Sequence, residues 1–330
     1  PDLFVICTGH NEFLETRMYR RIKQSARHFA WAHALATHLH TYNLLHTAAG
    51  HVVGNNASPS EERPTLPAEV DAFLDYKQGL KAYHRDDDWK AAVVAHFRQN
   101  LRGMVNLARR AGVPVVLVLP PSNLSASPPF KSQHTGGLTD AELTQWQSLI
   151  EQSAQALPAD LDGAIAALEA ALEIDDQYAL LHYQLANCYE SQGKLGSARR
   201  HYELARELDV CPLRAVAGIE AAIREVAAQT GVPLLDAHEL LESRCPSGIL
   251  GEQFLVDHVH PSFEGHQLIA AALQDEMVRQ GYVSPGTGWE QQRDQAYQAQ
   301  LESLDDIYYA RGKQRLTNLR IWAKGRADGP

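Results

Sequence analysis

An aspartate and a histidine three residues apart are the pair in this sequence best suited to proton transfer. The stretch FLVDHVHPSFEGHQLIAAAL (254–273) places Asp257 and His260 before Pro261 and an amphipathic helical pattern. In a turn or a first helical turn, residues i and i+3 lie on the same side. The carboxylate can then fix the tautomer of the imidazole and stabilise the imidazolium, as a general base serving a serine hydroxyl requires. The alternative is that these residues only cap the helix N-terminus.

A second candidate lies in the first residues, PDLFVICTGHNEF (1–13). A strand-like apolar run breaks there into Gly9, His10 and Asn11, so Asn11 is expected at a strand's C-terminal end, where α/β sites form. Its amide can donate to a developing oxyanion, an interaction worth a few kcal/mol of transition-state stabilisation. The alternative is a tight turn in which Gly and Asn supply permissive backbone angles.

Two further polar residues are candidates for binding substrate. Arg214, in CPLRA, is able to clamp an anionic group bidentately or to pair with a local carboxylate. Asn123 follows a predicted strand, and its side chain is likewise a candidate either for binding substrate or for a local structural contact. Gly9 and His10 join them as neighbours of Asn11.

A histidine-rich run is the only pattern that raises the question of a metal. It runs through the helix expected over 14–50 and one residue beyond it, and its members are His28, His33, His38, His40, His46 and His51. Metal-binding histidines need a tight face with carboxylates behind them, and this run has none. We therefore expect a packed helix here, no metal site and no cofactor.

Three short apolar runs predict the strands of a parallel sheet: LFVIC (3–7), VPVVLVL (113–119) and VPLLD (232–236). Each is nearly continuous in apolar residues, as strands buried on both faces are. The second and third each follow an amphipathic helical segment and a Gly-Val-Pro. Alternating helices and buried strands are typical of an α/β fold.

Between these units the sequence changes to paired helices with a 34-residue period, shown by ALEID (171–175) and ARELD (205–209). That period is the tetratricopeptide spacing. The segment 179–209 resembles one complete repeat, and the second helix of a preceding repeat is recognisable. The packing positions of the complete repeat are Leu185, Ala186, Tyr189, Ala198, Tyr202 and Ala205. The alternative is an ordinary helical hairpin.

The strand followed by Gly-x-Asn-Glu, together with Asp-x-x-His-Pro near the end, resembles the SGNH (GDSL-type) hydrolases, in a branch with inserted tetratricopeptide repeats. The resemblance covers 1–138 and 212–283. It implies a flavodoxin-like, three-layer parallel sheet. It also implies that Asn11 donates to the oxyanion hole and that Asp257 and His260 belong to the catalytic triad.

The chain departs from that family at the nucleophile. The Gly-Asp-Ser block and the following Gly block are absent from the sequence. We therefore expect a fragment whose nucleophilic serine lies upstream of Pro1 and which lacks activity by itself. We expect an α/β domain in two parts, 1–138 and 212–286. A helical insertion lies between them at 139–211, and a helical tail follows at 287–330.

The resemblance implies hydrolysis of an ester, with an O-acyl group of a carbohydrate as the favoured substrate. Acyl transfer to a polysaccharide hydroxyl would use the same residues. A protein-binding scaffold built on the repeats is the alternative from a different class.

Composition limits the partners. The formal charge of −10 argues against nucleic acid. No apolar run approaches the 18 residues of a membrane span. Cys7 and Cys188 are expected in the core, and Cys211 and Cys245 are candidates for a disulfide. The compartment stays open: periplasmic, membrane-anchored and cytoplasmic locations all fit.

Overall fold

The computed structural model describes residues 1–13, 80, 83–312, 314 and 317. The histidine-rich run and the helix expected over 14–50 lie outside these residues.

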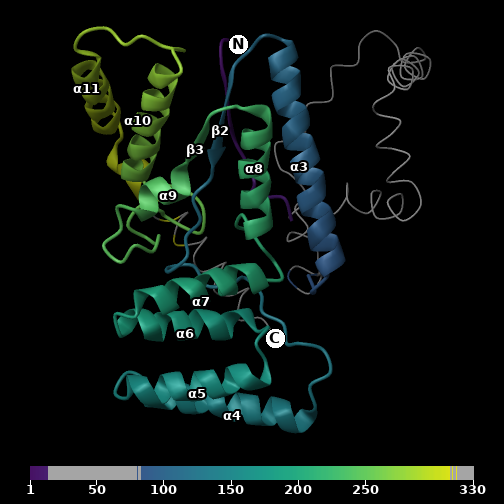
Figure 1. Ribbon diagram of the computed structural model, residues 1–330. Coiled ribbons are helices and arrows are strands. Elements are labelled where there is room, and N and C mark those ends of the chain that lie inside the picture. The colour runs from purple at the N-terminus through teal and green to yellow at the C-terminus, as the bar shows by residue number, and fades with distance from the viewer. Residues whose placement is uncertain (14–79, 81–82, 313, 315–316, 318–330) are drawn as a thin grey trace, which may run out of the picture. The chain divides into compact units, whose positions relative to one another are not determined.

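Three parallel strands form a small sheet in the order β1-β2-β3, at the centre of Figure 1. They are β1 (Phe4–Cys7), β2 (Val115–Leu119) and β3 (Leu234–Asp236), so all three strand predictions are confirmed. In the register, Ile6 lies opposite Leu117, which lies opposite Leu234. The carboxyl ends of the strands therefore open on one edge of the sheet.

The expected burial on both faces holds for β2, holds only in part for β3, whose three residues are half-buried, and is wrong for β1. All five residues of β2 are buried, whereas Phe4 and Val5 of β1 are 42% and 43% exposed. Within the described part of the chain, β1 pairs with β2 alone and forms an edge of the sheet. Phe4 and Val5 point to opposite faces of the sheet, so β1 is exposed on both faces, as a strand at a sheet edge can be.

Helices α3 (Asp87–Arg110) and α8 (Ala217–Thr230) pack against each other and against β2, together on one side of the strands in Figure 1. Helix α3 begins where the Asp86 side chain accepts a hydrogen bond from the Trp89 main-chain N–H. Its buried residues recur every three or four positions: Val93, Phe97, Leu101, Val105 and Ala108. This spacing forms the apolar stripe that covers the sheet.

Helices α9 (Ala237–Glu242) and α10 (Phe263–Arg279) contact each other and lie on the other side of the strands in Figure 1. The chain is therefore mixed α/β, as predicted. Helix α11 (Trp289–Glu302) follows and has no buried residue. Among the described residues, no helix combines the length and the apolar character needed to cross a membrane.

The segment between β2 and α8 forms two helical hairpins. The first pairs α4 (Asp140–Ala156) with α5 (Leu161–Ile174), and the second pairs α6 (Ala179–Ser191) with α7 (Leu195–Leu208). The packing positions predicted from the 34-residue period are all buried: Leu185, Ala186, Tyr189, Ala198, Tyr202 and Ala205.

The hydrophobic core of these hairpins also contains two residues from outside them. Leu124, just past β2, and Ile249, between α9 and α10, are both almost fully buried within it. The hairpins and the α/β body therefore share one core.

The cysteine predictions hold in part. Cys188 is buried, as expected, but Cys7 is exposed on the edge strand. Cys211 and Cys245 are both buried free thiols, so the disulfide considered for them is not formed. Cys245 packs with Leu241 beside α9, whereas Cys211 contacts Tyr83, so the two thiols lie in different environments.

Two stacked histidines are buried between α6 and α7. His182 Nδ1 lies 3.0 Å from His201 Nδ1, and His182 Nε2 lies 2.9 Å from the main-chain oxygen of Asp176. Because a carbonyl only accepts, His182 carries its proton on Nε2 and accepts from His201 Nδ1–H. The second His201 nitrogen, Nε2, faces Arg200 at 3.4 Å and accepts from it. The chain of hydrogen bonds is complete only when both rings are neutral.

This arrangement predicts a loss of stability in mild acid. Burial first, and then His182 and Arg200, lower the pKa of His201 from 6.5 to about 4; burial also lowers the pKa of His182. The unfolded chain binds protons more readily, so stability is full above pH 6.5 and falls as the pH drops toward 4. For His201 we expect a loss of about 2 kcal/mol between pH 7.5 and pH 5.

Chemical denaturation at both pH values measures this loss in the wild type and in the double variant His182→Phe, His201→Phe. The variant should lose less stability on acidification, although His10 and His258 keep part of the effect. An identical loss in both proteins would contradict the prediction.

Candidate active site at the Asp257–His260 turn

Asp257 and His260 form a close pair in the turn before α10. His260 Nδ1 lies 2.7 Å from Asp257 Oδ2. The other carboxylate oxygen, Oδ1, accepts the main-chain N–H groups of Val259 and His260, each at 2.8 Å. One oxygen therefore fixes the turn and the other orients the imidazole.

The capping alternative for this motif does not apply, because α10 has a different cap. Ser262 is the N-cap of α10, and its hydroxyl accepts from the Gly265 N–H at 3.1 Å. The turn closes with a main-chain hydrogen bond of 2.8 Å from Val256 N–H to the His260 carbonyl. Asp257 is thus available to the histidine.

The electrostatics suit a general base. Burial alone would raise the pKa of Asp257, but hydrogen bonds from the His260 ring and from two main-chain N–H groups outweigh it and lower the pKa to about 2. The hydrogen bond that His260 donates to Asp257 raises the pKa of His260 above 6.5, against a smaller effect of burial. Because the ionised Asp257 accepts a hydrogen bond from Nδ1–H, the proton of neutral His260 is on Nδ1 and the free lone pair is on Nε2. The side chain is 68% exposed, so a base faces solvent here.

Two more histidines lie around the pair and differ from it in burial. Burial lowers the pKa of His258 to about 4, despite the opposing charge of Asp257. Burial, followed by the nearby His258 and His260, lowers the pKa of His10 to about 3. Because His258 and His260 contribute to the lowered pKa of His10, the loop after β1 lies within electrostatic range of this turn. His10 Nδ1 also accepts the Ala215 N–H at 3.0 Å, so its ring is neutral and anchored.

Gly9 and Asn11 occupy that loop in different ways. Gly9 has φ +132°, and an added Cβ would lie 2.8 Å from Cγ2 of Ile219 in α8. The glycine is therefore required for the close approach of the loop to α8. Asn11 is exposed beyond it.

Asn123 and Arg214 are both 2% exposed, and a hydrogen bond joins the Arg214 side chain to the main chain of Asn123. Arg214 Nη1 donates to the main-chain oxygens of Asn123 at 2.5 Å and Ser127 at 2.8 Å. The structure thus brings these two candidates together beneath the Asp257–His260 turn, and substrate binding by either stays a prediction.

Sequence reasoning missed Asp209, a buried carboxylate whose hydrogen bonds come from three main-chain N–H groups. It accepts the main-chain N–H groups of Phe130 at 2.7 Å, Lys131 at 3.0 Å and Cys211 at 3.0 Å. In the sequence it ends the motif ARELD and was interpreted only as part of the repeat. The available signal in the sequence is its position three residues before Pro212 and five before Arg214.

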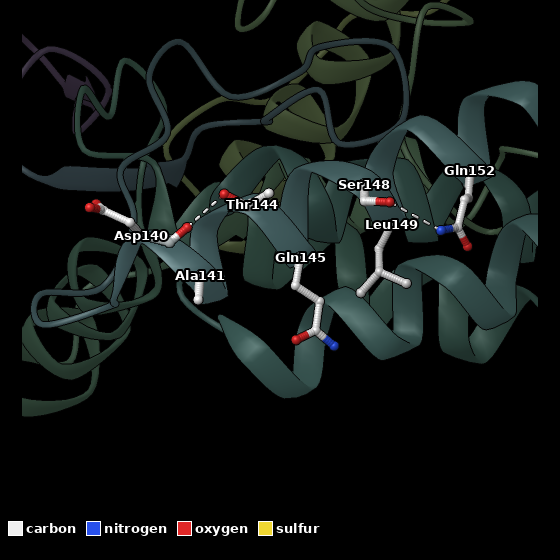
Figure 2. A pocket seen from close by; sticks show the side chains of 7 residues that line it. All are labelled: Asp140, Ala141, Thr144, Gln145, Ser148, Leu149 and Gln152. Carbon is white, nitrogen blue, oxygen red and sulfur yellow. Dashed lines mark hydrogen bonds between the residues drawn. The ribbon is translucent and has the colours of Figure 1, made fainter.

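A separate hollow lies along α4 and is open to solvent (Figure 2). It is lined by Asp140, Ala141, Thr144, Gln145, Ser148, Leu149 and Gln152. Hydrogen bonds within the helix engage Thr144 and Gln152, as the dashed lines show, and the Gln145 side chain is exposed. The hollow is lined by one helix with mostly small or polar side chains. Across the part of the chain that the structure covers, no cluster of three histidine, cysteine or acidic side chains is arranged to hold a metal ion.

Comparison with known proteins supports the helical hairpins. Residues 158–222 match a family model described as Tetratricopeptide repeat. This match covers α5, α6 and α7, so the chain contains a tetratricopeptide repeat region. Searches of curated proteins and of solved structures gave no significant match.

The geometry of the pair predicts a direct effect on the pKa of His260. In the variant Asp257→Asn, the carboxylate that stabilises the imidazolium is gone, so the pKa of His260 should fall to 6.5 or below. Titration of the His260 ring signals by NMR measures it.

Asp275→Asn, which removes an exposed acidic group from α10, is the matched control and should leave the His260 titration unchanged. An unaltered His260 pKa in Asp257→Asn would mean that the pair is not coupled in solution.

Proposed function

We propose that this chain carries most of an SGNH-type serine hydrolase acting on esters, with O-acyl groups of a carbohydrate as the favoured substrates. The observation that supports it best is the 2.7 Å contact between His260 and Asp257, with Nε2 of an exposed ring left as a base. The loop that carries Asn11 lies within electrostatic range of this turn at His10, which suits a donor to the oxyanion hole.

In the proposed reaction, Nε2 of His260 takes the proton of a serine hydroxyl as its oxygen attacks the ester carbonyl. Asp257 stabilises the imidazolium, and the Asn11 amide donates to the oxyanion. The imidazolium then protonates the leaving alcohol, and an acyl-serine remains. A water molecule, deprotonated by the same nitrogen, releases the acid and regenerates the serine. The reaction needs no metal or organic cofactor.

We assign the nucleophile to a serine upstream of Pro1. Among the described residues, no serine hydroxyl hydrogen-bonds to His260. Among the described residues β1 pairs on one side only, and its exposed Phe4 and Val5 fit a further strand beside it. With such a strand, the sheet between α3/α8 and α9/α10 would become the three-layer, flavodoxin-like fold of the SGNH family.

Acyl transfer to a polysaccharide hydroxyl is a variant of the same proposal. It shares every step up to the acyl-serine and replaces water by a sugar hydroxyl. Mass analysis of the carbohydrate after reaction separates the two, because only the transferase yields an acylated sugar.

The proposal predicts that the full-length gene product hydrolyses an aryl acetate and that His260→Ala lowers kcat at least about 1,000-fold, since the general base is lost. Initial rates at pH 8 measure the effect. His266→Ala, which removes an exposed histidine of α10 nine residues from Asp257, is the control and should retain full activity. Equal rates for wild type and His260→Ala would end the assignment of the base.

A protein-binding scaffold is the second candidate, and the Tetratricopeptide repeat match over 158–222 favours it. Repeats of this kind stack helices into surfaces that bind other proteins. The hollow on α4 is a candidate contact surface, because its exposed side chains are small or polar and leave the helix accessible (Figure 2).

If the scaffold is the function, a fluorophosphonate probe will not label the full-length protein, and partner binding will depend on α4. Gln145→Arg should then weaken binding of a cross-linked and purified partner at least 10-fold. Gln298→Arg makes the same change on exposed α11 and should not affect it. Probe labelling of the wild type together with unchanged binding by Gln145→Arg would reject the scaffold.

A further inference from the structure

Asn123 is buried directly behind the Asp257–His260 turn. It follows β2 after four residues and is 2% exposed. A buried amide side chain must find hydrogen-bond partners or lose the solvation that water gave it. Its partners therefore identify what holds it there.

Both hydrogen-bond donors of Asn123 point to the turn. Its main-chain N–H donates to the carbonyl of His258 at 3.0 Å. Its side-chain Nδ2 donates to the carbonyl of Asp257 at 2.9 Å. The two donors thus hold consecutive carbonyls of the segment between Asp257 and His260.

Both acceptors of Asn123 are engaged on the opposite side. Side-chain Oδ1 accepts the Ala126 N–H at 2.9 Å, and this fixes which end of the amide faces Asp257. The main-chain oxygen accepts from the buried guanidinium of Arg214, which also holds the Ser127 carbonyl. Each polar atom of Asn123 therefore has a hydrogen-bond partner, and these contacts fix the orientation of the side chain.

We propose that Asn123 is the positioning residue for the Asp257–His260 pair, held in place by Arg214. The inference rests on the proposed function for its catalytic meaning, but the positioning itself concerns only residues that this chain contains. Asn123 is buried and touches the pair through main-chain carbonyls, so it acts through Asp257 rather than on a substrate.

The positioning has a physical consequence for the base. Oδ1 of Asp257 accepts the N–H groups of Val259 and His260. The direction in which Oδ2 points therefore depends on the backbone at Asp257. A substitution at position 123 keeps the main-chain hydrogen bond to the His258 carbonyl but removes the side-chain hydrogen bond to the Asp257 carbonyl, so the contact from Oδ2 to the His260 ring loosens. A looser contact stabilises the imidazolium less.

The experiment compares Asn123→Ala and Asn123→Leu with the wild type by NMR titration of His260. In both variants the pKa of His260 should fall toward 6.5. Ser122→Ala is the matched control, since this neighbour is also fully buried and its hydroxyl bonds to no described group. An unchanged His260 pKa in folded Asn123 variants would overturn the proposal.

A measurement on the wild type covers the case in which both variants fail to fold. The side-chain amide signal of Asn123 should shift with the same midpoint as His260, because its partner is the Asp257 carbonyl. An Asn123 side-chain amide signal that does not shift as His260 titrates would overturn the proposal as well.

Kinetics of the full-length protein separate this inference from the proposed function. Asn123→Ala should lower kcat by up to about 100-fold, with little change in KM, and move the acidic limb of the pH profile with the His260 pKa. If the wild type is active and Asn123→Ala has the same kcat, the positioning role is rejected. A wild type without esterase activity, but with the NMR shifts, would reject the function and leave the positioning standing.

Discussion

Two fully buried charges, on Asp209 and Arg214, hold the segment that joins β2 to the helical hairpins. A charge removed from water must be paired and hydrogen-bonded, or its burial costs several kcal/mol. Asp209 meets this demand with three main-chain N–H groups and with the attraction of Arg214, and burial still raises its pKa to about 6. Arg214 meets it with two main-chain carbonyls. All these partners but Cys211 lie between Asn123 and Lys131, so the two charges fix the path of the segment that leaves β2.

That segment connects the repeats to the candidate site. Asn123 bonds to the turn that carries Asp257 and His260, while the next residue, Leu124, enters the core of the helical hairpins. Tyr183 of α6 donates to the Ser125 carbonyl at 2.7 Å, which ties the same stretch to the repeat again. The geometry of the turn therefore depends on contacts that begin in the repeats.

The sequence predicted the parts of this structure that depend on local pattern. The three strands, the α/β class and the repeat residues around Tyr202 follow from apolar periodicity and a fixed period, and all are found. The Asp257–His260 contact was predictable because three residues of spacing limit where the two side chains lie. The exposure of Cys7 was not, because an apolar strand pattern does not tell which side of the sheet lacks a neighbour. The roles of Asp209 and Asn123 depend on contacts about 80 and 130 residues away in sequence, which a single sequence does not contain.

The shared core has a consequence for how such a protein can be rebuilt. Leu124 and Ile249 come from either side of the hairpins in sequence, yet both lie in the hairpin core. Excising the repeats would expose these side chains to water, and grafting in a foreign repeat block would leave them without complementary shapes. A transplant succeeds only if it carries the loop after β2 and the stretch before α10 with it. The modular unit of this chain is thus larger than its repeat and includes the segment that holds the Asp257–His260 turn.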